Sequence, residues 1–445
     1  MAQVSPARKA TFAILKTIEK HGHSDTLLRG ATVDALSEAD RKLTTALVLG
    51  VLRWQIKLEH QFRPLLKHPN AKLDPEVLIA LRLGAFQLLH MDRIPARAAI
   101  DESVELTKQA GHRFASGMVN AVLRKLAETA AEQKNDGGNN DCREAYPAWI
   151  TTRWADSYGP EAACAICNHG QQQPDLRVRL NVEADEQELS AQGIELAPGE
   201  FLTAARRIVS GDVTKAVALR EGRIRIQDEG SQLIAELAPR GQKILDCCAA
   251  PGGKTLILAE RNPNAEIVAC DGSHQRLAEM RKRLRIAGDR VDCRLADVTH
   301  LQDENAFDVV LADVPCSGTG TLGRNPEIRH RLRPDDLSRQ SERQRAILQS
   351  ALQAARPGGH VLYSTCSLEP EENEQVVDAV LSGNARGRLV PLQSRIDELR
   401  SQAILTVNGA ERLLKCITTQ GHMRLLPGDF HTDGFFTALI EKTSG

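Results

Sequence analysis

Residues 245–255 read LDCCAAPGGKT and lie between the apolar pair Ile244-Leu245 and a segment of helical character. Small residues at such a strand-to-helix turn let backbone amides approach a ligand at the carboxyl end of the strand. A Walker A phosphate loop requires glycine six residues before its lysine, but residue 248 is cysteine, and the pattern G-x-G-x-x-G is absent. The turn therefore predicts a nucleoside ligand without a pyrophosphate.

Beyond residue 240, apolar strands alternate regularly with helical segments. The strand candidates are 244–245, 267–269, 291–295, 309–311 and 361–363. Apolar strands separated by helices indicate a parallel sheet that is covered on both faces. The prediction for this part of the chain is an α/β fold with a doubly wound, Rossmann-like sheet.

Three of these strands end at a carboxylate, namely Asp271, Asp297 and Asp313. Asp271 follows Gly252 by 19 residues, at the end of the second strand, where a carboxylate can bind both hydroxyls of a ribose. S-adenosylmethionine is the common nucleoside cofactor without a pyrophosphate. The alternative is that Asp271 merely caps the end of its strand. This interpretation is less favoured because three successive strands end at a carboxylate.

Two cysteines follow successive strands of the predicted sheet. Cys316 lies in the segment Asp313–Gly320 (DVPCSGTG), and Cys366 lies in Ser364–Leu368 (STCSL). Strands one, four and five are neighbours in a doubly wound sheet, so the two thiols can face one cleft although they are 50 positions apart. The alternative is that both are small buried residues, the usual fate of a free cysteine.

Two thiols beside a methyl donor suit the chemistry of cytosine. A thiolate that adds to carbon 6 makes carbon 5 nucleophilic, so that carbon 5 can accept a methyl group, and a second thiol can assist the later release. A zinc deaminase would need the pattern P-C-x-x-C, but residue 319 is threonine. Cys164, Cys167 and His169 resemble half of a zinc site, yet they fall in a helical stretch where core packing is favoured, so no metal is expected.

The N-terminal third of the chain has a different character. Residues 1–134 follow helical periods and carry a net charge of +6, which leaves −7 for the rest of a chain whose total is −1. Residues 135–141 (NDGGNND) predict a linker, residues 142–235 a small α+β RNA-contacting subdomain, and residues 236–445 the α/β domain. A basic module attached to an acidic one is compatible with RNA binding, and equally with an ordinary solvated surface. An arginine run that includes Arg324, Arg329 and Arg331 follows Cys316 and is a candidate phosphate contact.

The overall composition sets the cellular context. The 445 residues suggest roughly three domains. No apolar run reaches the roughly 18 residues that span a bilayer, so no membrane partner is expected. Ten cysteines without disulfide-type spacing, in a chain with no signal peptide, predict reduced thiols and a cytoplasmic protein. Nothing in the sequence indicates an obligate protein partner.

The motifs at 245–255, 313–320 and 364–373, with the closing DGFF at 433–436, resemble those of the bacterial ribosomal RNA cytosine-5 methyltransferase family called RsmB, also Sun or Fmu. Residues 39–54 and 94–124 resemble the RNA-binding NusB domain. The resemblance covers nearly the whole chain. It implies a class I methyltransferase sheet preceded by an all-helical domain, with S-adenosylmethionine as cofactor and 16S ribosomal RNA as substrate, either free or in an early small-subunit particle.

The resemblance also implies residue roles that the residues alone leave open, since DNA cytosine methyltransferases use the P-C thiol. It makes Cys366 the nucleophile and Cys316 the product-release residue, with Asp313 and Lys254 in the catalytic group. The implied cofactor-binding residues are Cys248, Ala249, Ala250, Pro251, Gly252, Gly253, Lys254, Asp271, Asp297 and Asp313. The alternatives are a transfer-RNA substrate, or a noncatalytic RNA-binding or assembly factor, against which the presence of both thiols argues.

Overall fold

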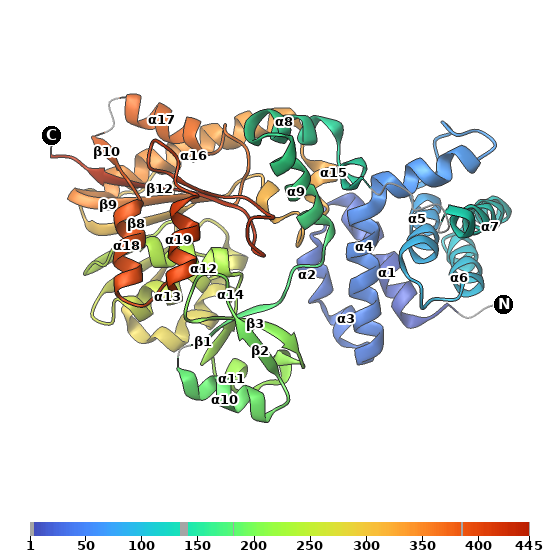
Figure 1. Cartoon of the computed structure of the whole chain (residues 1–445), viewed down its shortest axis with the longest axis horizontal. Helices are drawn as coiled ribbons and strands as arrows, with labels where there is room; N and C mark the ends of the chain where they lie inside the picture. Colours follow the sequence, from blue (N-terminus) through green and yellow to red (C-terminus); the bar gives the residue numbers. More distant parts are fainter. Residues whose placement is uncertain (1–3, 134–140, 181, 384–385, 445) are drawn as a thin grey trace. The chain divides into compact units, whose positions relative to one another are not determined.

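The structure, a computed structural model, describes residues 4–133, 141–180, 182–383 and 386–444. It divides into two compact units, which Figure 1 shows coloured along the chain. The first comprises the chain up to Gln173 together with Leu322–Arg331, and the second comprises Pro174–Thr321 and the chain from Leu332 onward. This division differs from the boundaries that the sequence predicts after residues 134 and 235. The predicted linker, apart from Asp141, lies outside the described residues.

The described residues of the first unit form helices joined by turns, and no strands. The α-helices are α1 Pro6–Lys20, α2 Ser24–Leu28, α3 Ala31–Asp34, α4 Glu38–Phe62, α5 Pro75–His90, α6 Ala96–Gln109, α7 Ser116–Gln133, α8 Ala148–Tyr158, α9 Pro160–Gln171 and α15 Ile328–Arg331, and the 3₁₀ helices are η1 Arg63–Leu65, η2 Arg113–Ala115 and η3 Cys142–Ala145. Ser37 starts α4, because its hydroxyl accepts a hydrogen bond from the amide of Asp40. Gly50 allows α4 to approach α5 closely, since a Cβ atom there would lie 2.0 Å from the ring of Phe86.

Residues 142–171 belong to the first unit because they pack on α4. Lys57 of α4 pairs with Glu144 at 3.1 Å, and the side-chain amide of Gln171 donates to the carbonyl oxygen of Arg53 at 3.1 Å. Both contacts join residues far apart in sequence. Local patterns therefore predict the helices of this segment but not the unit to which it belongs.

The second unit begins with a small antiparallel sheet in the strand order β2-β3-β1-β4. Its strands are β1 Arg177–Leu180, β2 Glu195–Pro198, β3 Ala205–Ser210 and β4 Ile224–Ile226, accompanied by α10 Glu183–Ala191, η4 Val213–Lys215 and α11 Val217–Arg220. Val178, Ile194 and Ile224 belong to its own buried cluster. The predicted α+β character of this region is thus present in residues 177–226.

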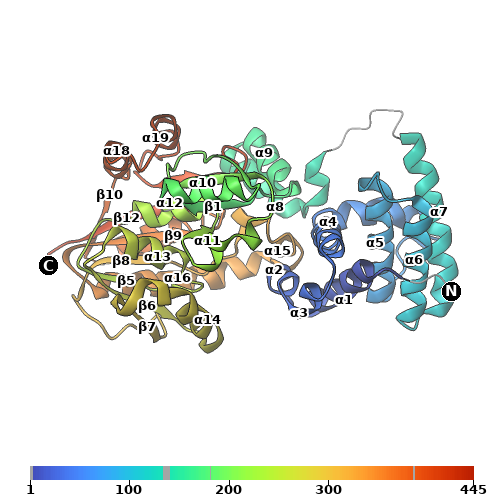
Figure 2. The same cartoon turned by 90° about the horizontal axis from the view of Figure 1, so that it is seen from below.

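The main sheet has the order β10-β12-β9-β8-β5-β6-β7, with β11 paired to β12. Its strands are β5 Lys243–Asp246, β6 Glu266–Asp271, β7 Val291–Leu295, β8 Phe307–Asp313, β9 Ala355–Thr365, β10 Gly387–Val390, β11 Met423–Leu425 and β12 Phe435–Lys442. The five strands β5–β9 pair in parallel, whereas β12 pairs antiparallel to β9. Figure 2 shows β8, β5, β6 and β7 following one another toward α14. The chain thus reverses its strand order between β5 and β8, which confirms the predicted doubly wound, Rossmann-like fold.

Helices cover both faces of this sheet, as Figure 1 shows. They are α12 Glu229–Leu237, α13 Gly253–Arg261, α14 His274–Leu284, α16 Pro334–Ala354, α17 Glu374–Ser382, α18 Gln393–Ser401 and α19 Val407–Leu414, with the 3₁₀ helices η5 Arg285–Arg290 and η6 Thr319–Thr321. Ile244 packs in the core with α12, α13, α18 and α19, while the next residue, Leu245, packs in the core with α16 and α17. Successive strand residues therefore point to opposite buried faces, as the apolar strands predict. Within the described ranges, no helix is both long and apolar enough to cross a membrane.

Two buried ion pairs fasten the small sheet to α12. Arg177 of β1 donates to Glu229 at 2.7 Å, and both side chains are almost wholly inaccessible to solvent. Arg179 of β1 donates to Glu236 at 2.7 Å, and these side chains are also buried. Glu229 further accepts hydrogen bonds from the three amides of residues 200–202, each at 2.8 Å, so its carboxylate contributes most to the position of the small sheet.

We expect Arg177→Ala to lower the free energy of unfolding of the second unit by about 3–5 kcal/mol, because Glu229 would lose its buried cationic partner. Urea titration followed by circular dichroism measures this change. Arg207→Ala is the matched control, since Arg207 of β3 is half exposed and lies 3.9 Å from Asp175. Equal stability of the two variants would contradict the assigned role of Arg177.

Candidate active site

The two predicted thiols lie together at the carboxyl edge of the main sheet. The strands β8 and β9 are parallel neighbours with Asp313 opposite Ser364, so the loops that follow them begin side by side. The Sγ atoms of Cys316 and Cys366 are 3.3 Å apart, within hydrogen-bond distance for sulfur. Two residues 50 positions apart are thus brought into direct contact, as the predicted strand order requires.

The environment of Cys316 disfavours its thiolate. The hydrogen bond to Cys366 raises the pKa of Cys316 well above its ordinary value, burial raises it further, and the nearby carboxylate of Glu372 acts in the same direction. Cys316 therefore carries its proton at neutral pH and can donate a hydrogen bond to the sulfur of Cys366.

A lysine and an aspartate lie beside the thiols. Lys254, near the start of α13, places its Nζ atom 2.7 Å from Oδ2 of Asp313 at the end of β8, and 5.8 Å from the centre of the Phe435 ring. Burial lowers the pKa of Lys254, but Asp313 and then Cys366 raise it, so that the net shift is above its ordinary value. The site therefore holds a positive charge that is paired directly with Asp313.

The loop 247–252 connects β5 to α13 in a tight turn. The amide of Gly252 donates to the carbonyl oxygen of Ala249 at 2.6 Å, and Gly252 has a φ of +98°, which residues with side chains rarely adopt. Asp246, at the end of β5, stabilises the turn, because it is buried and accepts a hydrogen bond from the hydroxyl of Thr255 at 2.7 Å. Burial raises the pKa of Asp246 to about 7. Burial also raises the pKa of Cys248, so this thiol is not a reactive group at neutral pH.

The remaining predicted carboxylates end β6 and follow β7. Asp271 is 4% exposed, accepts a hydrogen bond from the amide of Ser273 at 2.8 Å and pairs with Arg276 at 3.4 Å. It therefore does cap its strand end, as the simpler interpretation holds. Asp297 is exposed, and hydrogen bonds from the hydroxyl and then the amide of Thr299 lower its pKa.

Two of the three predicted RNA-binding arginines make internal contacts within the first unit. Arg329 is 1% exposed, donates to the carbonyl oxygens of Arg53 and Gly170 at 3.1 Å, and stacks 3.9 Å from the centre of the Tyr146 ring. The prediction that Arg329 contacts RNA is wrong, because its guanidinium is buried and bonded inside the protein. Arg331 donates to the carbonyl oxygens of Ile18 and Gly22. Arg324 remains a prediction.

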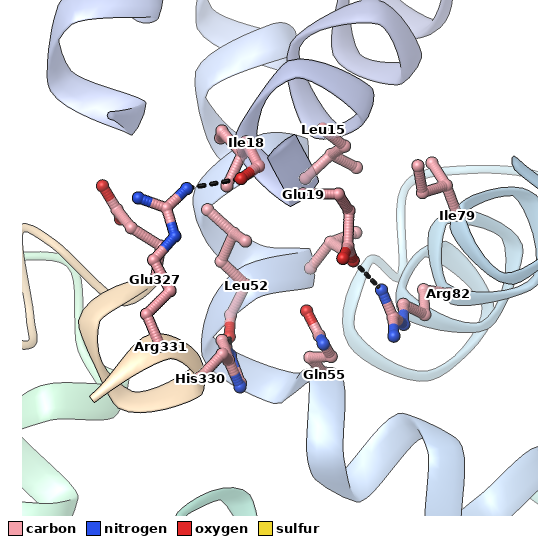
Figure 3. A pocket seen from close by; sticks show the side chains of 11 residues that line it. Leu15, Ile18, Glu19, Leu52, Gln55, Ile79, Arg82, Glu327, His330 and Arg331 are labelled. Carbon is pink, nitrogen blue, oxygen red and sulfur yellow. Dashed lines mark hydrogen bonds and ion pairs between the residues drawn. The ribbon is translucent and has the colours of Figure 1, made fainter. Parts of the chain in front are cut away.

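Arg331 also borders a cavity of about 180 Å³ within the first unit. Figure 3 shows its guanidinium reaching Ile18 of α1, while Glu19 faces Arg82 across the cavity. The neighbouring His330 bonds the carbonyl oxygen of Leu52 at 2.7 Å, and burial lowers its pKa to about 3. The segment 322–331 thus completes the helical unit from the side of α1 and α4.

Sequence reasoning missed Glu372, which is fully buried and bonded to both thiol loops. It is one of three acidic residues in the run EPEEN, so nothing local in the sequence separates it from the other two. Elsewhere, no group of three or more His, Cys, Asp or Glu residues in the described part of the chain is arranged to hold a metal ion. Cys167 of the half zinc motif is buried in α9, and its carbonyl oxygen accepts a hydrogen bond from Tyr146.

Comparison with known proteins agrees with this architecture. Residues 234–441 match the family model described as 16S rRNA methyltransferase RsmB/F, and residues 5–128 match the NusB family. The probable ribosomal RNA small subunit methyltransferase B of Bacillus subtilis is 31% identical over 99% of this chain and 100% of its own length. Its counterpart in Vibrio cholerae is 31% identical over 98% of this chain and 97% of its own length. The crystal structure of PH0851 matches with a TM-score of 0.79 at 26% identity, over 99% of this chain and 100% of that one.

Fold, site and comparisons together define a Rossmann-like methyltransferase that carries a helical NusB-like domain. The chain belongs to the RsmB/F family of 16S rRNA methyltransferases. The resemblance seen in the sequence motifs is thereby confirmed.

We expect Arg329→Gln to destabilise the first unit by about 1–3 kcal/mol for each buried carbonyl group that loses its donor. All three tryptophans, at 54, 149 and 154, lie in this unit, so tryptophan fluorescence during urea unfolding reports on it. Arg97→Gln is the matched control, because the Arg97 side chain is 93% exposed. An Arg329→Gln variant that keeps its stability but binds RNA less tightly would restore the RNA-contact interpretation.

Proposed function

We propose that this protein methylates carbon 5 of a cytosine in 16S ribosomal RNA, with S-adenosylmethionine as donor and a covalent bond between Cys366 and the base. The observation that carries the proposal is the 3.3 Å contact between two thiols at the carboxyl edge of the sheet, in a chain of this family. Carbon 5 of cytosine is not nucleophilic by itself, so a reaction at this atom needs a thiol in such a position.

The order of steps follows the roles that the family resemblance implies for the two thiols. The Cys366 thiolate adds to carbon 6 of cytosine, which places electron density on carbon 5 and allows this carbon to form its bond to the methyl group. Loss of the carbon-5 proton to solvent then restores the double bond and breaks the bond between Cys366 and carbon 6. Cys316 keeps its proton and lies in hydrogen-bond contact with the Cys366 sulfur, so it can stabilise Cys366 as this thiolate departs.

Lys254 and Asp313 support this chemistry electrostatically. The ammonium group of Lys254 lies next to Asp313 and can stabilise negative charge that develops in the site during the reaction. Asp313, at the end of β8, pairs with Lys254 and would offer its carboxylate as a hydrogen-bond acceptor to the target base.

The residues of the cofactor loop and β6 fit S-adenosylmethionine, which supplies an electrophilic methyl group when bound. The backbone of residues 248–253 forms a glycine-shaped turn suited to the methionine portion. An ionised carboxylate offers about four acceptor positions. Asp271 therefore has capacity for two ribose hydroxyls beyond its bonds to Ser273 and Arg276, and Asp297 would lie near the adenine.

The substrate proposal follows the names of the relatives, which act on small-subunit ribosomal RNA. The NusB-like region, 5–128, would hold the RNA, and residues 234–441 would carry out the reaction. The substrate would be free 16S RNA or an early small-subunit particle in the bacterial cytoplasm. Bisulfite sequencing of ribosomal and transfer RNA, from a strain that lacks the protein, separates a ribosomal RNA substrate from a transfer RNA substrate.

We expect Asp271→Ala to weaken binding of S-adenosylhomocysteine, because about 1.5–3 kcal/mol is lost with each charged hydrogen bond to the ribose. Isothermal titration calorimetry measures the affinity. Asp292→Ala is the control, since Asp292 of β7 is a half-exposed carboxylate that forms an ion pair with Arg294. Unchanged affinity of the Asp271 variant would overturn its assignment.

The two thiols should give opposite results when each is changed to alanine. Cys366→Ala cannot form the bond to carbon 6, so it should neither methylate RNA nor become covalently attached to it. Cys316→Ala should still attack and transfer methyl, and then accumulate as an adduct, because the departing thiolate loses its hydrogen-bond donor. Denaturing electrophoresis detects the adduct as a shifted protein–RNA band.

Cys293→Ala serves as the control, because Cys293 lies on β7, away from the thiol pair, and its turnover should be normal. A shifted band from Cys366→Ala but none from Cys316→Ala would reverse the two roles. Near-normal turnover of both variants would show that the cysteines are structural.

A further inference from the structure

Hydrogen bonds on both sides of the thiol pair hold its two loops together. Before the cysteines, the amide of Val314 donates to the carbonyl oxygen of Ser364 at 2.9 Å. After the cysteines, the hydroxyl oxygens of Ser317 and Ser367 lie 3.0 Å apart. The two sulfur atoms therefore lie between two contacts that join the loops, and the loops cannot separate without breaking one of them.

A buried carboxylate fastens the same loops. Glu372 accepts hydrogen bonds from the amide of Ser317 at 2.8 Å and from the hydroxyls of Ser317 and Ser367. The side-chain amide of Gln344 on α16 donates to Glu372 at 3.0 Å. Because these contacts reach the residue after each cysteine alike, they keep the two sulfur atoms at their separation of 3.3 Å.

Small molecules can reach both thiols from solvent. Cys316 and Cys366 are partly exposed, whereas Cys167, Cys247 and Cys270 are buried. The sulfur atoms of a disulfide lie about 2 Å apart, so this pair needs to close by only roughly 1.3 Å. Accessible cysteines with a second thiol beside them are the kind that oxidise reversibly.

We propose that Cys316 and Cys366 form a site of reversible oxidation, in which a peroxide converts the two thiols to a disulfide and this bond switches off methyl transfer. The bond occupies both sulfur atoms, so neither can add to a base. Its formation needs only the thiol pair, whereas its effect on methylation rests on the proposed function. In a reducing compartment such a bond is transient, which suits a switch.

The oxidation uses one hydrogen peroxide for each pair of thiols. One cysteine, as the thiolate, attacks a peroxide oxygen, the oxygen–oxygen bond breaks, and the departing hydroxide takes up the proton that the thiol released. The sulfur is then a sulfenic acid. The second sulfur attacks the first, so that the sulfur–sulfur bond forms, the sulfur–oxygen bond breaks, and the hydroxide leaves as water with the proton of the second thiol.

Two thiols and one hydrogen peroxide thus give one disulfide and two water molecules, and two electrons pass from sulfur to oxygen. The second thiol is already in contact with the first, which favours this step over attack by a further peroxide. The disulfide therefore also protects the site, because a further peroxide would carry the sulfenic acid to sulfinic acid, which thiols do not reduce.

Peptide mapping of the full chain, after a slight molar excess of hydrogen peroxide, tests whether the bond forms. Iodoacetamide blocks the remaining thiols, and trypsin then places the two cysteines on separate peptides, residues 295–324 and 346–386, each with a single cysteine. We expect these two peptides to be linked and dithiothreitol to separate them. Links spread over other partly exposed cysteines, such as Cys142 and Cys293, or sulfinic acid at Cys366 without a link, would overturn the proposal.

Methylation assays on the same oxidised samples test the switch. Methyl transfer to RNA should fall in proportion to the linked fraction and return when dithiothreitol is added. A fully linked protein that methylates RNA at the normal rate would contradict the switch. The mapping uses neither RNA nor cofactor, so an active Cys366→Ala variant would refute the proposed reaction and the effect on it, while the linked peptides would still establish the disulfide.

Cys316→Ala removes the partner thiol and keeps Cys366. At higher peroxide, this variant should accumulate sulfinic acid at Cys366, so less free Cys366 should return after dithiothreitol than in the unmodified protein. Cys293→Ala is the matched control, because Cys293 on β7 is also partly exposed, and its loss should change neither the link nor its reversal. Equal recovery of Cys366 in Cys316→Ala and in the unmodified protein would show that the pair gives no protection and would overturn the proposal.

Discussion

The parallel pairing of β8 with β9 is the constraint on which the site depends. It sets Asp313 opposite Ser364, and hydrogen bonds continue the pairing into the loops beyond, from the amide of Val314 to Ser364 and from the amide of Gly320 to Cys366, both at 2.9 Å. Gly320 must lack a side chain, because a Cβ atom there would lie 2.5 Å from the carbonyl oxygen of Gly434 and 2.8 Å from that of Cys366. The two thiols are in contact because these hydrogen bonds hold the loops after β8 and β9 side by side.

The polar contacts around the site follow from the pairing of these two loops. Lys254 comes from α13 and bonds Asp313 at the end of β8, whereas the buried Glu372 accepts hydrogen bonds from Ser317 and Ser367, the residues that follow the two cysteines. Because these groups come from different elements, they meet only where the loops lie side by side.

The helical unit and the catalytic loops are also linked through the chain itself. Directly after Thr321 the chain enters the first unit, where Glu327 accepts hydrogen bonds from the amide and hydroxyl of Ser24 at 2.9 and 2.8 Å, and Arg329 bonds buried carbonyl groups. It returns to the second unit at Leu332. The helical unit is therefore built from two separate parts of the sequence, and a truncation at the predicted linker would remove the Ser24 partner of Glu327 and the Arg53 partner of Arg329.

The sequence by itself determined the alternation of strands and helices, the doubly wound sheet, and the meeting of Cys316 with Cys366, because these follow from local periodicity and from the rule that parallel strands end at one edge. It also indicated the helical N-terminal region. Only the tertiary structure decided that Arg329 is an internal anchor, that residues 142–171 and 322–331 join the helical unit, and that Glu372 binds both thiol loops. An arginine in a basic run and a glutamate in an acidic run look alike whether solvated or buried. What distinguishes them is the set of carbonyl groups and donors that distant segments bring to them, and no local pattern encodes that set.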